Sequence, residues 1–216
     1  MRLRPPASYR RFAADGYDGV LPSRQPRDQV SDDIIEVVLE ILEEDGYDGL
    51  QLRAVASRAR MSLSTIYKLF GSREELIAKA VERWMEDNAY VNATPPRRNE
   101  SPYEWYLRFI HAIFEPWQRN PAMLRALVRA QMSPEGARLR TESADRFWAI
   151  APDVFKDSDP AFVADLMLIM YHVLDSASAK FVAGDIKIGD VLSLLERTLL
   201  RIFAGEPQAP KSRRRR

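Results

Sequence analysis

The sequence predicts an all-α protein of about nine helices, with an N-terminal three-helix head and a larger helical domain after it. Two observations support this fold class. From residue 28 onward, apolar residues recur three and four positions apart, which is the spacing of one face of a helix. No segment shows the sustained alternation of apolar and polar residues that indicates a half-buried strand.

The two ends of the chain lack this periodicity. Residues 1–27 are rich in proline, glycine and arginine, and we expect a flexible basic arm there. Residues 206–216 end in KSRRRR and are expected to form a basic, disordered tail. Neither a secretory signal nor an uninterrupted apolar run of about 18 residues is present, so we predict no membrane association and a cytoplasmic protein.

The residues that carry most catalytic chemistry are scarce. The chain has no cysteine and two histidines, His111 and His172, and no carboxylate pair lies on a recognisable active-site helix. These observations argue against an enzyme, and we predict no catalytic residues, no metal site and no cofactor.

The first predicted helix begins at Asp28 and ends at Gly46. Two short helices follow, at about 51–58 and 62–70, separated by a tight turn, and together they form a helix-turn-helix at about 51–70. The spacing of Ser72 and Glu75 is that of a capping box, which starts a fourth helix that runs to about Tyr90.

The second half of the chain repeats one device for starting a helix. After a linker at 92–100, a polar cap is followed by proline at four predicted helix starts. These are Ser101-Pro102, Asn120-Pro121, Ser133-Pro134 and Asp159-Pro160. The last helix is predicted to begin near 185–189 and to end before Gly205.

Charge is segregated within the first third of the chain. Residues 28–48 contain nine acidic side chains and no basic one, whereas residues 51–73 contain five basic side chains and no acidic one. Such a local basic run is typical of a surface that binds phosphates, although a solvated basic face is the simple alternative.

The second short helix has two distinct faces. Ile66 and Phe70 lie four residues apart and are predicted to face inward. The opposite face carries Ser62, Ser64, Thr65 and Lys68, which can bond phosphates or base edges as a recognition helix does. A purely structural three-helix corner in an enzyme is the alternative.

The stretch GLQLRAVASRARMSLSTIYKLFGSREELI resembles the DNA-binding signature of the TetR family of bacterial transcriptional regulators, with the close match over about residues 30–77. Arg60 stands where the family often has glycine, and Leu63 and Leu69 stand where polar residues are common. The resemblance implies a set of DNA-binding residues. They are Arg53, Ser62, Leu63, Ser64, Thr65, Tyr67, Lys68, Ser72 and Arg73.

The resemblance also implies the domain organisation. Residues 28–88 would form the DNA-binding domain, and residues 89–205 would form a domain that binds an effector and dimerises. Aromatic and methionine side chains of the second domain suit an adaptable apolar pocket, although each is individually more typical of plain core. The candidate lining residues are Trp105, Phe109, Ile113, Phe114, Trp117, Leu124, Leu127, Val128, Phe147, Trp148, Met167, Met170, Tyr171 and Leu174. His111, His172 and Asp175 are candidates for the polar contacts.

The last two helices are apolar around much of their circumference, which suggests a second copy of the chain as a partner. The candidate dimer residues are Leu166, Val173, Phe181, Val191, Leu194, Leu195, Thr198 and Ile202.

These inferences predict a nucleoid-associated, ligand-responsive regulator, with a repressor favoured, that binds a palindromic double-stranded DNA operator as a homodimer. Within the family, the chain is most similar to the actinobacterial repressors of steroid catabolism. That similarity implies a bulky apolar effector, such as a steroid, a lipid-like molecule or a coenzyme A thioester. The alternative is a helical protein that binds a hydrophobic ligand or a protein partner but no DNA.

Overall fold

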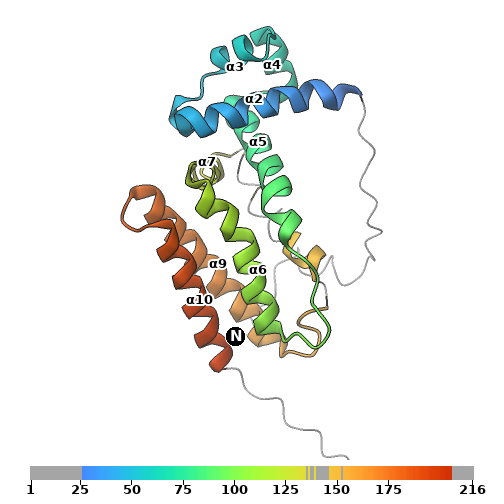
Figure 1. The fold of residues 1–216 in the computed structure, drawn as a ribbon, viewed down its shortest axis with the longest axis vertical. Coiled ribbons are helices and arrows are strands. Elements are labelled where there is room, and N and C mark those ends of the chain that lie inside the picture. The colour runs from blue at the N-terminus through green and yellow to red at the C-terminus, as the bar shows by residue number, and fades with distance from the viewer. Residues whose placement is uncertain (1–25, 135, 137–138, 140–145, 152, 206–216) are drawn as a thin grey trace, which may run out of the picture. The chain divides into compact units, whose positions relative to one another are not determined.

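A computed structural model describes residues 26–134, 136, 139, 146–151 and 153–205. The predicted basic arm and tail therefore lie outside the described residues, except that Pro26 and Arg27 already belong to the first helix. The described part of the chain contains eight complete α-helices, one short 3-10 helix, a helical segment at 146–150 and no strand, which confirms the all-α prediction (Figure 1). The elements are α2 (Pro26–Gly49), α3 (Leu52–Arg58), α4 (Leu63–Phe70), α5 (Arg73–Asn88), η1 (Tyr90–Asn92), α6 (Pro102–Arg119), α7 (Pro121–Gln131), α9 (Pro160–Ala183) and α10 (Ile188–Ala204).

The chain divides into two compact units. Among the described residues, the head unit consists of 26–94 and 112–150, and so contains α2 to α5, the end of α6 and α7. The hairpin unit consists of 95–111 and 151–205, and so contains the start of α6 with α9 and α10.

Helix α2 supplies the core of the head unit and is broken where the sequence predicts. Ile34, Val38 and Leu42 on its inner face are fully buried. Gly46 has φ 71° and ψ −178°, a region of backbone space that glycine alone occupies readily. The break turns the chain toward α3, so the glycine is needed for its backbone and not for space around it.

The turn between α3 and α4 is a Schellman motif, in which the last carbonyls of α3 are satisfied by the amides that follow. Met61 N donates to Ala56 O at 2.9 Å, and Arg60 N donates to Ser57 O at 3.2 Å. Arg60 has φ 54°, so it takes the left-handed conformation usual for glycine at this position.

Helix α5 begins with half of the predicted capping box. Ser72 Oγ accepts a hydrogen bond from Glu75 N at 3.0 Å, as expected. The reciprocal bond is absent, because Ser72 N donates to Phe70 O at 2.8 Å in the tight turn before the helix. The carboxylate of Glu75 instead lies 3.1 Å from Lys79 Nζ.

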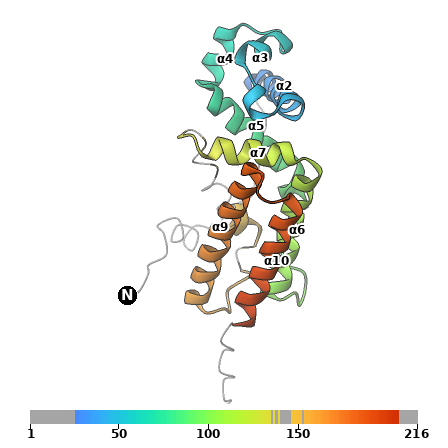
Figure 2. The same ribbon diagram turned by 90° about the vertical axis from the view of Figure 1, so that its left-hand side faces the viewer.

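Helix α7 packs against α2 and α5 and runs crosswise beneath α2 (Figure 2). Two polar contacts fasten it to the end of α2. Asn120 Nδ2 donates to Glu43 Oε1 at 2.6 Å, and Arg129 is 2.7 Å from an oxygen of Asp48. The side chain of Asn120 therefore does not cap its own helix, contrary to the prediction.

Three of the four predicted polar-proline helix starts are confirmed, since α6, α7 and α9 begin at Pro102, Pro121 and Pro160. At the fourth, Ser133 Oγ accepts a hydrogen bond from Gly136 N at 3.0 Å, which is a cap-like turn. Most of the residues that would continue a helix from Pro134 lie outside the described residues.

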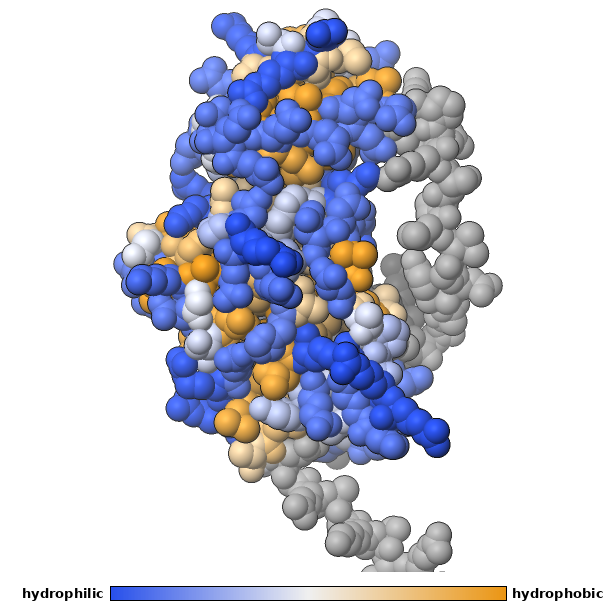
Figure 3. All heavy atoms as spheres, in the orientation of Figure 1, coloured by the Kyte–Doolittle hydropathy of each residue, from blue (hydrophilic) through white to orange (hydrophobic). Residues whose placement is uncertain are grey.

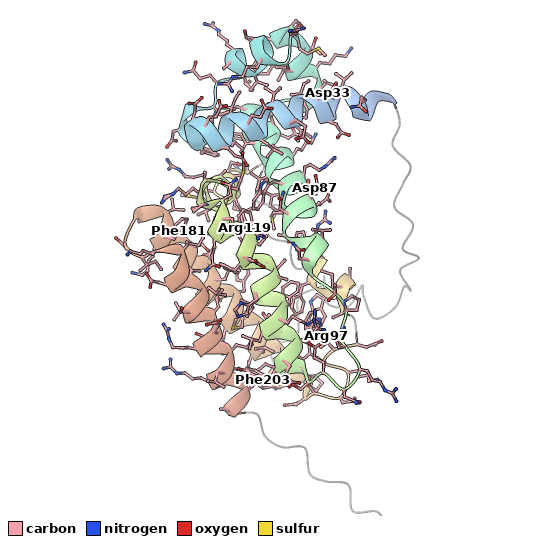
Figure 4. The ribbon with its side chains drawn as sticks, in the orientation of Figure 1. Asp33, Asp87, Arg97, Arg119, Phe181 and Phe203 are labelled. Atoms are coloured by element: carbon pink, nitrogen blue, oxygen red, sulfur yellow. The ribbon has the colours of Figure 1, made fainter. Side chains whose placement is uncertain are left out.

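The hairpin unit is built on the antiparallel pair α9 and α10. Gly184, at φ 86°, ends α9 in a Schellman motif, with Asp185 N donating to Lys180 O at 3.0 Å. Figure 4 labels Phe181 near this turn and Phe203 at the opposite end of the hairpin. The ring of Phe203 packs edge-on against Phe162 at 5.2 Å between centroids.

Helix α9 is more apolar than its packing on α10 requires. By length and composition it is the one described helix that could cross a membrane, although core helices of soluble proteins meet the same test. Its exposed apolar side chains include Leu168, Ile169 and Tyr171, at 51%, 42% and 42% exposure. Orange, hydrophobic surface is accordingly visible over parts of the hairpin unit (Figure 3).

Candidate nucleic-acid interface

Helix α4 presents a polar face because its two buried apolar residues point into the head unit. Ile66 and Phe70 are 1% and 2% exposed, as predicted from their spacing. The opposite side of the helix leaves Ser64 and Lys68 exposed, with Tyr67 half-exposed at its flank. The helix therefore offers hydroxyl, amine and phenol groups to solvent from a firmly anchored backbone.

Three hydroxyl groups gather at the start of α4. Ser62 Oγ caps the helix by accepting a hydrogen bond from Thr65 N at 3.1 Å. The same oxygen lies 2.8 Å from Ser64 Oγ and 2.8 Å from Thr65 Oγ1. The cluster fixes the rotamers of Ser64 and Thr65, the two residues predicted to reach base edges.

The acidic run on α2 is used within the head unit. Arg58, at the end of α3, donates to Glu44 Oε2 at 2.6 Å and lies 3.8 Å from Asp45. The hydrogen bond to Glu44 raises the pKa of Arg58 above its usual value. Part of the acidic run on α2 is thus paired with a basic side chain of α3, so the charges that are segregated in the sequence hold these two helices together.

The guanidinium of Arg73 also makes its contacts within the head unit. Its Nε donates to Leu50 O at 2.8 Å, a second nitrogen donates to Tyr47 O, and a third lies 3.2 Å from Glu74. The guanidinium also lies over the ring of Tyr47, 4.7 Å from its centroid. This geometry gives no support to the predicted phosphate contact of Arg73, because its donors hold the turn before α3.

Tyr47 links Arg73 to α7. The guanidinium of Arg129 lies 5.8 Å from the centroid of the same ring, and Arg129 also pairs with the neighbouring Asp48. Sequence reasoning missed this cluster, because its members come from three helices that are far apart in the chain. The only signal was the excess of acids around an aromatic residue at the end of α2.

The other predicted DNA-binding residues lie on or beside the polar side of the helix-turn-helix. Arg53 is exposed near the start of α3, Leu63 is half-buried in the first turn of α4, and Ser72 caps α5. Hydrophilic side chains cover much of the head unit on the face drawn in Figure 3. A surface of this kind can bond phosphate oxygens through its cations and base edges through its hydroxyls.

Two family models match the chain. Residues 34–80 match the bacterial regulatory proteins of the tetR family, and residues 100–202 match the Tetracyclin repressor-like C-terminal domain. Together they cover more than half of the chain. The chain belongs to the TetR family. Members of the TetR family are transcriptional regulators, which confirms the prediction that this protein is not an enzyme.

Individual TetR relatives agree with this assignment. The chain is 33% identical over 99 residues to the HTH-type transcriptional repressor KstR of Rhodococcus jostii, and the match covers 46% of each chain. The chain therefore spans about half the length of this curated relative in the match. A TetR transcriptional regulator from Rhodococcus sp. RHA1 has the same fold, with a TM-score of 0.65 at 14% identity over 83% of this chain and 98% of that one. A TetR variant from Acinetobacter baumannii, solved in complex with minocycline, has a TM-score of 0.57 at 18% identity, and the match covers 85% of this chain and 96% of that one.

The residues predicted to line a TetR effector pocket fall in both units. Those buried are Trp105 and Met170 in the hairpin unit and Phe114, Trp117, Leu124, Leu127 and Phe147 in the head unit. Those half-buried are Phe109, Met167, Ile113, Val128 and Trp148. Tyr171 and Leu174 lie instead on the exposed side of α9, as do His172 and Asp175. His111 is also exposed and contacts Glu196 at 2.7 Å.

The residues predicted to form the dimer interface divide in a similar way. Four of them are buried within the subunit, where α9 and α10 pack on one another. They are Leu166, Phe181, Val191 and Leu195. Val173, Leu194, Thr198 and Ile202 are half-buried. Five large apolar side chains that were not among the predicted dimer residues are exposed on the pair. They are Leu168, Ile169, Tyr171 and Leu174 of α9 and Leu200 of α10.

Proposed function

We propose that this TetR-family regulator is a ligand-responsive repressor that binds a palindromic DNA operator as a homodimer and releases it when an apolar effector binds. The single observation that carries this proposal is the polar face of α4, anchored by buried Ile66 and Phe70. The similarity to KstR repressors favours repression over activation. Acting on a chromosome, the protein would work in the cytoplasm, associated with the nucleoid.

On this surface we assign base reading to Ser64 and Thr65, whose hydroxyls are held by the Ser62 cap. Arg53, Tyr67 and Lys68 would position the head on phosphates. Two heads of a symmetric dimer would then read two half-sites one helical turn, or a multiple of it, apart.

Thr65→Ala tests the assignment of base reading. We expect the variant to lose about 1–3 kcal/mol of discrimination between bases at one position of each half-site, because one directional contact is lost. The base preferred at that position should change as a result. The measurement is enrichment of duplexes from a random pool by the full wild-type chain and by the variant. Failure of the wild-type chain to enrich any duplex at low salt would favour the alternative, a helical protein that binds a ligand or partner but no DNA.

The proposed effector is a bulky apolar molecule, such as a steroid, a lipid-like compound or a coenzyme A thioester. The aromatic side chains of α6 support an apolar ligand, and Trp117 contacts Trp84 of α5 with 4.4 Å between ring centroids. Displacement of Trp117 would move α5, which starts directly after the helix-turn-helix. A tenfold loss of operator affinity needs about 1.4 kcal/mol of differential binding between the two states.

We assign the dimer interface to the exposed apolar side of α9 and α10. A Leu168→Glu substitution is expected to shift the protein from dimer to monomer, because it would bury an unpaired carboxylate in each half of a symmetric contact. Light scattering coupled to size exclusion measures the mass. Val91→Glu is the matched control, since Val91 is 66% exposed and lies outside this hairpin. A Leu168→Glu protein that remains dimeric would remove this face from the interface.

A further inference from the structure

The turns that end α3 and α9 share one hydrogen-bonding motif but differ in the residue at its left-handed position. At the end of α9 this residue is Gly184, with φ 86°, and at the end of α3 it is Arg60, with φ 54°. A Cβ atom disfavours this conformation, so glycine is the residue that the position ordinarily selects. Arg60 is exposed, and its packing gives no reason for a large side chain there. A backbone outlier of this kind points to a function for the side chain.

The charge of Arg60 is available in a way that two neighbouring arginines are not. Arg58 is held by Glu44, and Arg73 donates to backbone carbonyls and Glu74. Among the residues that the structure describes, no acidic group or carbonyl engages the guanidinium of Arg60. Exposed Arg53 and Lys68 share this property, one near the start of α3 and the other on α4.

Arg60 also lies close to the start of the helix that we propose reads the operator. It precedes Ser62, the cap of α4, by two residues, so their Cα atoms are within about 8 Å. A recognition helix enters the major groove by its N-terminal residues, between two rows of phosphates. A planar guanidinium at this point suits bidentate bonding to a phosphate.

We propose that Arg60 is a phosphate-contacting residue of the operator surface, additional to Arg53 and Lys68. This inference rests on the proposed function and deepens it. The contact would fix the entry of α4 into the groove without reading sequence, because phosphates are the same at every base pair. It would also account for a side chain at a position where glycine would be less strained.

The test combines three substitutions whose effects on folding and DNA affinity differ. Arg60→Gly and Arg60→Asn remove the charge and suit the left-handed backbone, whereas Arg60→Lys keeps both the charge and the strain. Arg119→Ala is the control, because it removes the same charge from an exposed site on α6 outside the helix-turn-helix. The probe is a synthetic duplex enriched by the wild-type chain, with affinity measured at several salt concentrations of about 0.05–0.2 M.

We expect Arg60→Gly and Arg60→Asn to bind about threefold to tenfold more weakly per head, with the slope of log affinity against log salt smaller by about 0.9 per head. Their melting temperatures should stay unchanged or rise by about 1–3 °C as strain is relieved. Arg60→Lys should retain the wild-type salt slope, and Arg119→Ala should match wild type.

Several outcomes would overturn the inference. Wild-type salt dependence in Arg60→Gly, with the duplex still bound, would show that Arg60 is only a solvated charge and would leave the proposed function intact. Weaker binding with a lowered melting temperature would show instead that Arg60 supports the turn. If the wild-type chain binds no duplex at any salt concentration, the proposed function fails, and the inference fails with it.

Discussion

Replacing Arg73 with methionine is expected to lower the free energy of unfolding by about 2–4 kcal/mol and to weaken binding to every DNA duplex alike. The substitution removes the donors to Leu50 O and Tyr47 O, so two carbonyls of a partly buried turn lose their partners. The turn sets the start of α3, and its loosening would misplace the helix-turn-helix. The expected fall in melting temperature is about 5–10 °C for a chain of this size.

Salt dependence separates this structural role from a direct phosphate contact. If Arg73 only holds the turn, Arg73→Met weakens DNA binding but leaves the slope of log affinity against log salt concentration unchanged. Lys68→Met is the matched control, because Lys68 is exposed on α4 with no partner among the described residues. It should reduce the slope by about 0.9 per head with an unchanged melting temperature. A reduced slope with unchanged stability in Arg73→Met would restore the phosphate contact that the sequence predicted.

Replacing Glu100 with glutamine is expected to lower the free energy of unfolding at neutral pH by about 2–4 kcal/mol, because it leaves the charge of Arg108 poorly compensated. Glu100 receives two hydrogen bonds of 2.8 Å from the Arg108 guanidinium, and its side chain is 9% exposed. The bond from Arg108 lowers the pKa of Glu100 from 4.5 to about 2.

The sign of the pH dependence follows from this lowered pKa. The contribution of Glu100 is fully present above pH 4.5 and is lost as the pH falls toward about 2, so acid should reproduce the effect of the substitution. Urea unfolding at several pH values in this window should show that the free energy of unfolding of the wild type falls as the pH falls. The part of this fall that comes from Glu100 should be missing in Glu100→Gln. The control is Glu115→Gln, which alters an exposed pair with Arg119 and should leave stability within about 0.5 kcal/mol. Equal pH dependence in the Glu100→Gln variant and the wild type would refute the assignment.

The elements that the sequence predicted best are those with local signals. The spacing of Ile66 and Phe70, the helix starts at Pro102, Pro121 and Pro160, and the break at Gly46 all depend on residues within a few positions of one another. Local spacing also indicated the motif that identified the family. Such features survive folding because nothing in the tertiary structure competes with them.

The roles of individual charges could not be predicted, because they depend on which distant side chains arrive beside them. Arg58 and Arg73 looked equivalent to Arg53 and Lys68 in the basic run, yet both are taken up by partners from α2, the turn after it or α5. In the same way, the apolar stripe on α9 predicted a partner but could not indicate which of its side chains pack inside the subunit. Leu166 packs inside the subunit, whereas Leu168 remains exposed.

The contact between Trp84 and Trp117 has a practical consequence. Their rings lie 4.4 Å apart at 35°, one on α5 and one on α6, and both side chains are almost fully buried. Two indole chromophores at this separation absorb as a coupled pair, so their near-ultraviolet circular dichroism depends on the distance and angle between them. The unlabelled protein therefore carries its own optical readout of the α5–α6 geometry, and compound libraries can be screened on it before any operator is known.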